Sequence, residues 1–266
     1  MAESFLTEVV EPVAPTPPVA RDVAPVLAVE GVTKRFPGVV ALDDVSVEFY
    51  PGEVHAVVGE NGAGKSTLMK VLAGAYRPDS GTIRLDGAPV VFNHPSEAQA
   101  AGISIIYQEF NLLPERTVME NIFLGREPHR FGVIDYGRLE EDTLAVLKRL
   151  EAEALISPTA LLGGLSVAQQ QVVEIAKALS YDAKVLIMDE PTAALGVPEQ
   201  RKVHELVRTL KSQGVPVIII SHNMQDIFAS ADRIIVMRRG SKVGDVLAKE
   251  TDGERLVGLM VGAGEA

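Results

Sequence analysis

Residues 59–67, with the sequence GENGAGKST, constrain the fold of this chain more than any other stretch. They match the pattern G-x-x-x-x-G-K-[ST], they follow the apolar run at 54–58, and they precede residues 68–73, which predict a helix. The glycines let successive backbone N–H groups turn inward around an anion, and the helix adds the positive end of its dipole. We therefore predict a phosphate-binding loop, although glycines that only turn a strand into a helix would look the same in isolation.

The side chains of this loop indicate a nucleotide with its metal ion. Lys65 places a positive charge where the β- and γ-phosphates would lie, and the hydroxyl of Ser66 is a ligand for Mg²⁺. The predicted phosphate contacts of the loop are Gly59, Glu60, Asn61, Gly62, Ala63, Gly64, Lys65, Ser66 and Thr67.

Composition places the chain among ordinary globular proteins. With 266 residues, 47% apolar and 23% charged, it has enough material for one large or two modest domains. The formal net charge of -11 argues against a general nucleic-acid-binding protein, because phosphate backbones are held largely by Lys and Arg. The absence of cysteine excludes disulfides, thiolate catalysis and Cys-ligated metals. The apolar runs are too short to span a bilayer and residues 1–11 lack a basic start, so we expect neither a membrane span nor secretion.

The chain opens with a Pro-rich segment and then changes character. Residues 1–25 combine proline with Ala, Val and Thr, a composition that favours extended, solvated backbone, and we expect a disordered tail there. A folded domain is expected from residue 26 to residue 262. Near its start, Phe36 lies on a predicted turn at 34–38, where it would be either a core plug or a platform for an adenine ring.

Strand and helix signals alternate along the rest of the chain. Residues 42–49 alternate apolar and polar side chains, as in a half-buried antiparallel strand, and residues 82–92 predict a hairpin around Asp86-Gly87. Helices and apolar strands then alternate, which is typical of a wound α/β core with ligands at the carboxyl ends of its strands. The segment from about 109 to 180 holds helical patterns, and its first part shows no strand pattern, so we predict an inserted helical subdomain.

Two acids follow the apolar strand predicted at 185–188. If the loop at 59–67 holds phosphates, Asp189 and Glu190 would lie beside them at the carboxyl edge of the sheet. Magnesium takes one or two carboxylates together with phosphate oxygens, so Asp189 can hold the ion while Glu190 polarises an attacking water. A solvated acidic turn before Pro191 is the plainer alternative.

Gln108 and His222 also follow buried strands, at 103–107 and 215–221. A lone Gln or His at a strand end is most often only hydrogen-bonded to a loop. Their shared position at the predicted edge of the phosphate loop and the acids favours a functional role. The other histidines lack this context, and we expect structural roles for His55, His94, His129 and His204.

A further helix start is ambiguous on its own. Ser166 with Gln169 three residues later is a capping box, which in most proteins only begins a helix. The same geometry leaves a helix N-terminus and a hydroxyl free to meet an anion.

Taken in order, these motifs resemble the ATP-binding subunit of ABC transporters, over roughly residues 26–247. The resemblance implies an α/β fold with a P-loop NTPase core of ABC type, an antiparallel β subdomain and the inserted helical subdomain. Finer features look like the subclass that energises bacterial uptake of monosaccharides such as ribose, xylose or fructose. These features are the sequences QEFNL at 108–112, SVAQQQVVEIAKAL at 166–179 and PTAAL at 191–195.

The resemblance also implies how the site works. Two ATP molecules with Mg²⁺ would lie between two such subunits, each nucleotide held by one subunit's loop with Phe36 under the adenine. The other subunit would contribute Ser166, Ala168 and Gln169 at the γ-phosphate. Glu190 would act as general base and His222 as a switch, and the metal would be held by Ser66, Gln108 and Asp189.

Partners and location follow from the same resemblance. We expect a second ATP-binding subunit, a homodimer being the simplest case, with transmembrane permease subunits and an external sugar-binding protein, and no nucleic acid. The protein would lie peripherally at the cytoplasmic face of the inner membrane. A soluble ABC-type ATPase acting on nucleic acid or ribosomes is the alternative, for which long coiled-coil insertions or basic segments would be expected.

The sequence departs from the family pattern at three places. The signature usually reads LSGGQ, and here Val167 and Ala168 replace both glycines, which leaves the backbone N–H groups available but changes the local geometry. Gly196 stands where many relatives have Asp, so one contact across the dimer is expected to be lost. Many sugar-uptake relatives carry two such domains in one chain, so we expect this domain either to form a homodimer or to pair with a second ATPase chain.

Overall fold

A computed structural model describes residues 23–193 and 195–262 of the chain. Nearly all of the tail predicted at 1–25 therefore lies outside the described residues. Within the described part, none of the helices is long and apolar enough to cross a membrane.

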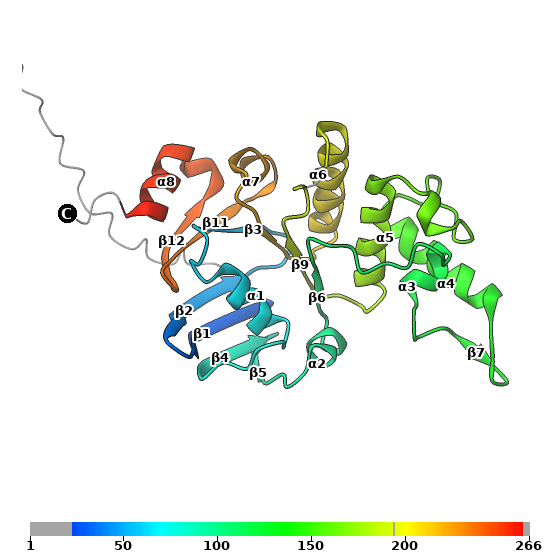
Figure 1. Ribbon diagram of the computed structural model, residues 1–266, viewed down its shortest axis with the longest axis horizontal. Helices are drawn as coiled ribbons and strands as arrows, with labels where there is room; N and C mark the ends of the chain where they lie inside the picture. Colours follow the sequence, from blue (N-terminus) through cyan, green and yellow to red (C-terminus); the bar gives the residue numbers. More distant parts are fainter. Residues whose placement is uncertain (1–22, 194, 263–266) are drawn as a thin grey trace, which may run out of the picture.

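A six-stranded sheet forms the centre of the fold (Figure 1). Five of its six strands run parallel to one another, and the edge strand β12 pairs antiparallel with β11. The parallel strands are short and largely apolar because both faces of the sheet are covered. In spatial order the strands are β12 (Ser241–Leu247), β11 (Arg233–Arg238), β3 (Val54–Val58), β10 (Val217–Ile220), β9 (Val185–Asp189) and β6 (Ile103–Ile106).

Successive side chains of β9 point to opposite faces of the central sheet and pack into two separate layers of the core. Val185 and Ile187 pack into a cluster with α1 (Lys65–Leu72), whereas Leu186 and Met188 pack into another cluster with α5 (Val167–Leu179). Each of these four side chains is fully buried, which stabilises the fold by roughly 1.5–3 kcal/mol per side chain. Consequently α1 and α5 lie on opposite faces of the sheet (Figure 1).

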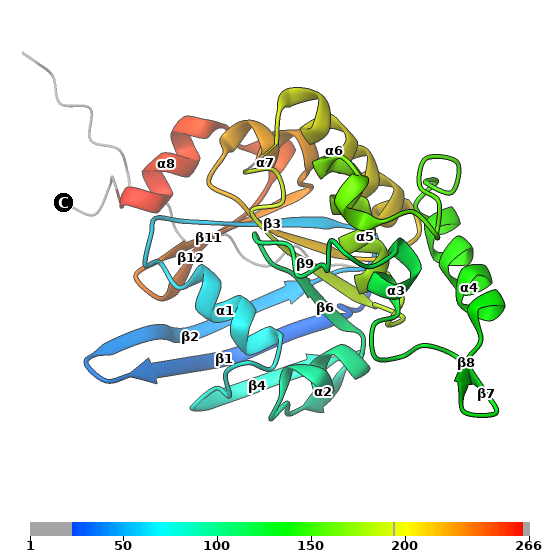
Figure 2. The ribbon, with the colours of Figure 1, turned by 45° about the vertical axis from the view of Figure 1, so that its right-hand side comes forward.

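A second, antiparallel sheet covers the face that carries α1 (Figure 2). The turn predicted at 34–38 is narrower than expected, because β1 continues to Phe36 and β2 begins at Val39, so only Pro37 and Gly38 form the turn. The hairpin predicted at 82–92 is present. The strands, in spatial order, are β2 (Val39–Phe49), β1 (Leu27–Phe36), β4 (Ser80–Leu85) and β5 (Ala88–Val90).

The inserted segment is helical, as predicted, with one addition. A two-stranded hairpin, β7 (His129–Arg130) with β8 (Val133–Ile134), projects from it. The prediction of no strand in this segment was therefore wrong. The turn of this hairpin is formed by Phe131 and Gly132, whose φ angles of 54° and 82° are those of a primed turn. Phenylalanine is not a residue that indicates such a turn, so the sequence pattern did not predict it. The helices of this part are α3 (Val118–Ile122), α4 (Tyr136–Arg149) and α5, preceded by the 3₁₀ turn η1 (Leu162–Gly164).

Helix α4 ends at Arg149. Its last carbonyls are capped at Leu150, and Glu151 adopts φ 56°, which an α-helix does not tolerate. The remaining helices are α2 (Pro95–Ala100), α6 (Val197–Ser212), α7 (Met224–Ser230), α8 (Gly253–Val261) and the 3₁₀ turn η2 (Ala248–Glu250). The fold class is confirmed, while the boundaries 26–262 and 109–180 stay predictions.

Candidate nucleotide-binding site

The loop between β3 and α1 is fixed by packing against two other strands. A Cβ on Gly59 would overlap the carbonyl oxygen of Met237 in β11, and a Cβ on Gly64 would lie 2.7 Å from that of Ala41 in β2. Gly62 and Gly64 adopt φ of 82° and 104°, a region that only glycine enters without strain. The glycines are therefore required by the loop's shape and its surroundings, and not only by a tight turn.

Lys65 begins α1 and folds its side chain back over the loop. Its Nζ donates hydrogen bonds to the carbonyl oxygens of Gly59, at 2.7 Å, and Glu60, at 2.9 Å. Burial lowers the pKa of this ammonium, while the negative charges of Glu190 and Asp189 oppose that shift. The charge of Lys65 is thus held within electrostatic reach of both acids.

The acids stand at the carboxyl end of β9, where the sheet places them beside the loop. Burial raises the pKa of Asp189, the charge of Glu190 raises it further, and Lys65 opposes the change. Glu190 adopts φ 47°, and its N–H donates to the carbonyl oxygen of Ile220 in β10 at 2.9 Å. The left-handed conformation of a non-glycine residue raises the free energy of the folded state by about 1–3 kcal/mol, and it persists where the surrounding structure holds it.

His222 reaches Glu190 from the neighbouring strand. The pairing of β9 with β10 brings Asp189 opposite Ile220, so the residues just beyond them come together. His222 Nδ1 lies 2.8 Å from Glu190 Oε1, within hydrogen-bonding distance. The His222 side chain is 70% exposed, against 25% for Glu190, so the imidazole is open to a ligand while the carboxylate is sheltered.

Gln108 and Phe36 are further side chains predicted to meet the nucleotide, and both are exposed. Gln108 is exposed just after β6, the strand next to β9. The Phe36 ring packs edge-on against Tyr76, with centroids 5.3 Å apart, yet 37% of the residue remains exposed. Phe36 is therefore only partly a core plug, and its exposed surface is available to an adenine ring.

Helix α5 begins with a capping box formed by Ser166 and Gln169. Ser166 Oγ accepts a hydrogen bond from the Gln169 N–H at 3.3 Å, and Gln169 Oε1 accepts one from the Ser166 N–H at 3.0 Å. Ala168 is buried, whereas Val167, the other replacement for a glycine, is 47% exposed. Because α5 packs on the face opposite α1, the structure does not bring Ser166, Ala168 and Gln169 to the loop of the same chain.

The residues at the strand end fit a magnesium ion. Burial and the neighbouring charge of Glu190 raise the pKa of Asp189, a half-buried carboxylate, and a cation at this place would offset the repulsion between the two acids. Across the described ranges, no group of three or more His, Asp and Glu side chains could hold an ion by itself. Magnesium suits such a place because it combines one or two carboxylates with phosphate oxygens and waters. Ser66, exposed at the start of α1, can complete this set.

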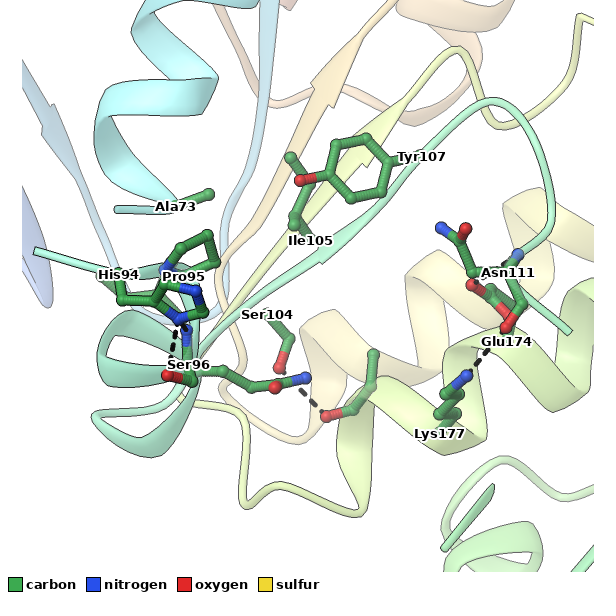
Figure 3. Close-up of a pocket in the computed structure, with 13 residues that line it drawn as sticks. Ala73, His94, Pro95, Ser96, Ser104, Ile105, Tyr107, Asn111, Glu174 and Lys177 are labelled. Carbon is green, nitrogen blue, oxygen red and sulfur yellow. Dashed lines mark hydrogen bonds between the residues drawn. The ribbon is translucent and has the colours of Figure 1, made fainter. Parts of the chain in front are cut away.

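A cavity of about 350 Å³ opens beside the segment that follows Gln108 (Figure 3). It lies between α2, β6 and α5, and Glu174 of α5 is buried in its wall. Glu174 Oε1 accepts a hydrogen bond from the Asn111 N–H at 3.4 Å, and Lys177 Nζ donates to the Asn111 carbonyl oxygen at 2.8 Å. Burial raises the pKa of Glu174. The sequence does not predict a role for Glu174, because its only distinguishing feature there is a charged residue in the middle of a largely apolar helix.

The loop, the paired acid and histidine and the common sheet edge are those of a P-loop nucleotide-binding protein. Comparison with known proteins is more specific: the model of the ABC transporter family matches residues 42–193. The chain belongs to this family.

The relatives in this family include sugar import proteins. Over 238 residues the chain is 53% identical to the ribose import ATP-binding protein RbsA 1 of Rubrobacter xylanophilus, covering 90% of this chain and 47% of that protein. It is 49% identical over 248 residues to a putative ribose/galactose/methyl galactoside import ATP-binding protein of Burkholderia ambifaria, covering 93% and 48%. The chain therefore spans about half the length of the curated relatives it matches.

Solved structures share the fold along nearly their whole length. An ATP-binding cassette of an ABC transporter in its ADP conformation superimposes with a TM-score of 0.77 at 27% identity, covering 90% of this chain and 99% of that one. The cbiO1 protein of Clostridium perfringens, part of an ABC transporter complex, gives a TM-score of 0.76 at 28% identity and covers 88% and 93%.

Proposed function

We propose that the chain is the ATP-hydrolysing subunit of an ABC importer that carries a monosaccharide. The observation that carries the proposal is the contact between Glu190 and His222 at the sheet edge that also holds Lys65. The names of the relatives, which are ribose or ribose/galactose import ATP-binding proteins, support a sugar as the cargo.

Hydrolysis would use the groups at this edge in distinct roles. The N–H groups of the loop and Lys65 would hold the phosphates, and Mg²⁺ on Ser66, Gln108 and Asp189 would offset their charge. Glu190 would take the proton of a water whose oxygen attacks the γ-phosphorus, while the bond to the oxygen of ADP breaks. His222 would orient Glu190 through the 2.8 Å contact and present its exposed ring to the γ-phosphate.

A second copy would complete the site. Since α1 and α5 pack on opposite faces of the sheet, the cap at Ser166, with Ala168 and Gln169, is better placed to meet the nucleotide of a neighbouring subunit. ATP would then close a head-to-tail dimer, and hydrolysis would let it open.

The motion would pass to a permease at the cytoplasmic face of the inner membrane, supplied with sugar by an external binding protein. The cavity beside Asn111 is the surface that we assign to the permease, because one of its walls is the segment after Gln108, which leads from the nucleotide edge of the sheet into the helical subdomain and would carry the motion there. The net charge of -11 does not favour a nucleic-acid partner.

Removal of the loop ammonium tests nucleotide binding. Lys65→Ala should abolish ATP binding and hydrolysis, measured by a fluorescent ATP analogue and by phosphate release, whereas Lys148→Ala, on the exposed end of α4, should change neither. Tight binding by the Lys65 variant would refute the assignment of the loop.

Transport itself is tested by purifying the chain with its permease and measuring ribose uptake into vesicles driven by ATP.

Mixing two variants tests the shared site. Ser166→Asp keeps a good helix cap but sets a negative charge against the phosphate, so it should be inactive, as should Lys65→Ala. Each mixed dimer retains one site with an intact loop and an intact Ser166. About a quarter of the wild-type activity should therefore return in an equimolar mixture. No recovery, with mixed dimers present, would show that Ser166 does not act across an interface.

A further inference from the structure

A buried hydrogen bond joins the segment after Glu190 to the helix after His222. Thr192 Oγ1 donates to Asp226 Oδ2 at 2.6 Å, and the two residues are only 4% and 7% exposed. Thr192 lies in the turn that follows β9, and Asp226 lies in the first turn of α7. The bond therefore spans the same two chain segments as the contact between Glu190 and His222.

The other oxygen of Asp226 is directed toward a third element. His204 Nε2, on α6, lies 3.2 Å from Asp226 Oδ1 as a close electrostatic contact and not an aligned hydrogen bond. Helix α6 also holds the turn itself, because Gln200 Nε2 donates to the carbonyl oxygen of Leu195 at 3.1 Å. Asp226 is thus held between the turn and α6, because one carboxylate oxygen contacts Thr192 and the other contacts His204.

Few other contacts of the described residues fix Glu190 in its strained conformation. Its N–H bonds to Ile220, and its carbonyl oxygen accepts a bond from the Ala193 N–H at 3.2 Å. The first bond ties the backbone of Glu190 to the strand that leads to His222, and the second stays within the turn. The bond between Thr192 and Asp226 joins the same two segments through side chains, two residues beyond Glu190 and four beyond His222, so it limits how far the turn and α7 can move apart.

We propose that Asp226 is a positioning residue for hydrolysis: by holding Thr192 it keeps Glu190 and His222 within hydrogen-bonding distance. The inference rests on the proposed function only for its effect on turnover. Asp226 touches neither the nucleotide nor the reacting water. Its effect on Glu190 and His222 can be measured without any turnover.

Two substitutions of Thr192 separate the hydroxyl from the packing. Thr192→Val keeps the shape but removes the donor, and it should lower kcat at least about tenfold with the KM for ATP little changed, because the phosphate loop is untouched. Thr192→Ser keeps the donor and should retain most of the wild-type kcat. Asp226→Asn retains an acceptor without the charge, so it should fold well and lower kcat by a smaller factor in the same direction.

An ion pair between a buried arginine and a half-buried aspartate, outside the site, provides the control for stability. Asp245→Asn breaks the pair of Asp245 with Arg233, between β11 and β12, and should lower the Tm without lowering kcat. If Thr192→Val lowers only the Tm, as this control does, or if Thr192→Ser is as slow as Thr192→Val, Asp226 has no positioning role.

The nitrogen chemical shift of His222 Nδ1 gives a readout that does not depend on activity. In protein labelled with ¹⁵N-histidine, Thr192→Val should move this signal and Thr192→Ser should not, with the signal assigned from a His222→Asn variant. An unmoved signal refutes the positioning role even if turnover falls. A moved signal in a chain that hydrolyses no ATP would support the positioning role and refute the proposed function.

Discussion

Alanine at two glycines of the phosphate loop should cost different amounts of stability. Gly62 and Gly64 both adopt positive φ, at 82° and 104°, where alanine is strained by about 1–3 kcal/mol. A Cβ on Gly62 would have no atom within 4 Å. A Cβ on Gly64 would lie 2.7 Å from the Ala41 carbonyl oxygen and 3.1 Å from Leu42 Cδ2, and relieving such an overlap costs about 1–3 kcal/mol more.

Thermal unfolding without nucleotide measures this difference. For a chain of this size, 1 kcal/mol corresponds to about 2–4 °C in Tm, so Gly62→Ala should lower the Tm by about 2–12 °C and Gly64→Ala by about 4–24 °C. Comparing the two variants removes the conformational strain they share and leaves the contact with β2. Equal losses would refute the reasoning, because they would mean that the backbone of Ala41 does not confine the loop.

Three further predictions concern single side chains. Glu190→Gln should still bind ATP but release phosphate about 10²–10⁴ times more slowly, and unchanged turnover would remove Glu190 as the general base. The pKa of Glu174 is raised by burial, so the folded state binds its proton more tightly and loses stability as pH rises from the unfolded to the folded pKa. Relative to wild type, Glu174→Gln should therefore be more stable against denaturant at about pH 7 than at about pH 4, and a difference independent of pH would contradict this account. Phe36→Leu keeps an apolar contact with Tyr76 but loses the ring, so ATP affinity should fall by about 1 kcal/mol with little change in Tm. Unchanged affinity would leave Phe36 as a core plug.

The sequence was most informative where the chemistry is local. The loop of Lys65 and the acids at the end of β9 are contiguous motifs whose flanking strands are apolar enough to identify. The nearness of Glu190 and His222 was also predictable in outline, since parallel strands end at the same edge of a sheet. Their 2.8 Å contact was not, because sequence patterns do not predict the left-handed conformation that Glu190 adopts there.

Contacts between distant side chains lay beyond the sequence patterns. Asp226 and Thr192 are 34 residues apart, and Glu174 is 63 residues from Asn111, so neither pair has a local signature. His204 was expected to be structural, and its contact with Asp226 is visible only once α6 and α7 are packed together. Hydrophobic periodicity tells which face of a helix is buried, but not which polar side chain meets another there.

The division of the site between two subunits that we propose would have its origin in the pleat of β9. Val185 and Ile187 face α1, while Leu186 and Met188 face α5, because successive side chains of a strand point to opposite faces. A shift of β9 by one residue would exchange these sets and place Asp189 among the buried side chains, so the arrangement is fixed by the burial of the whole strand. The loop before α1 and the cap before α5 are thereby held on different faces of each chain. A site that needs both the phosphate loop and the cap before α5 is most simply built from two chains. The packing of the core, and not only the loop, therefore favours an interface between subunits.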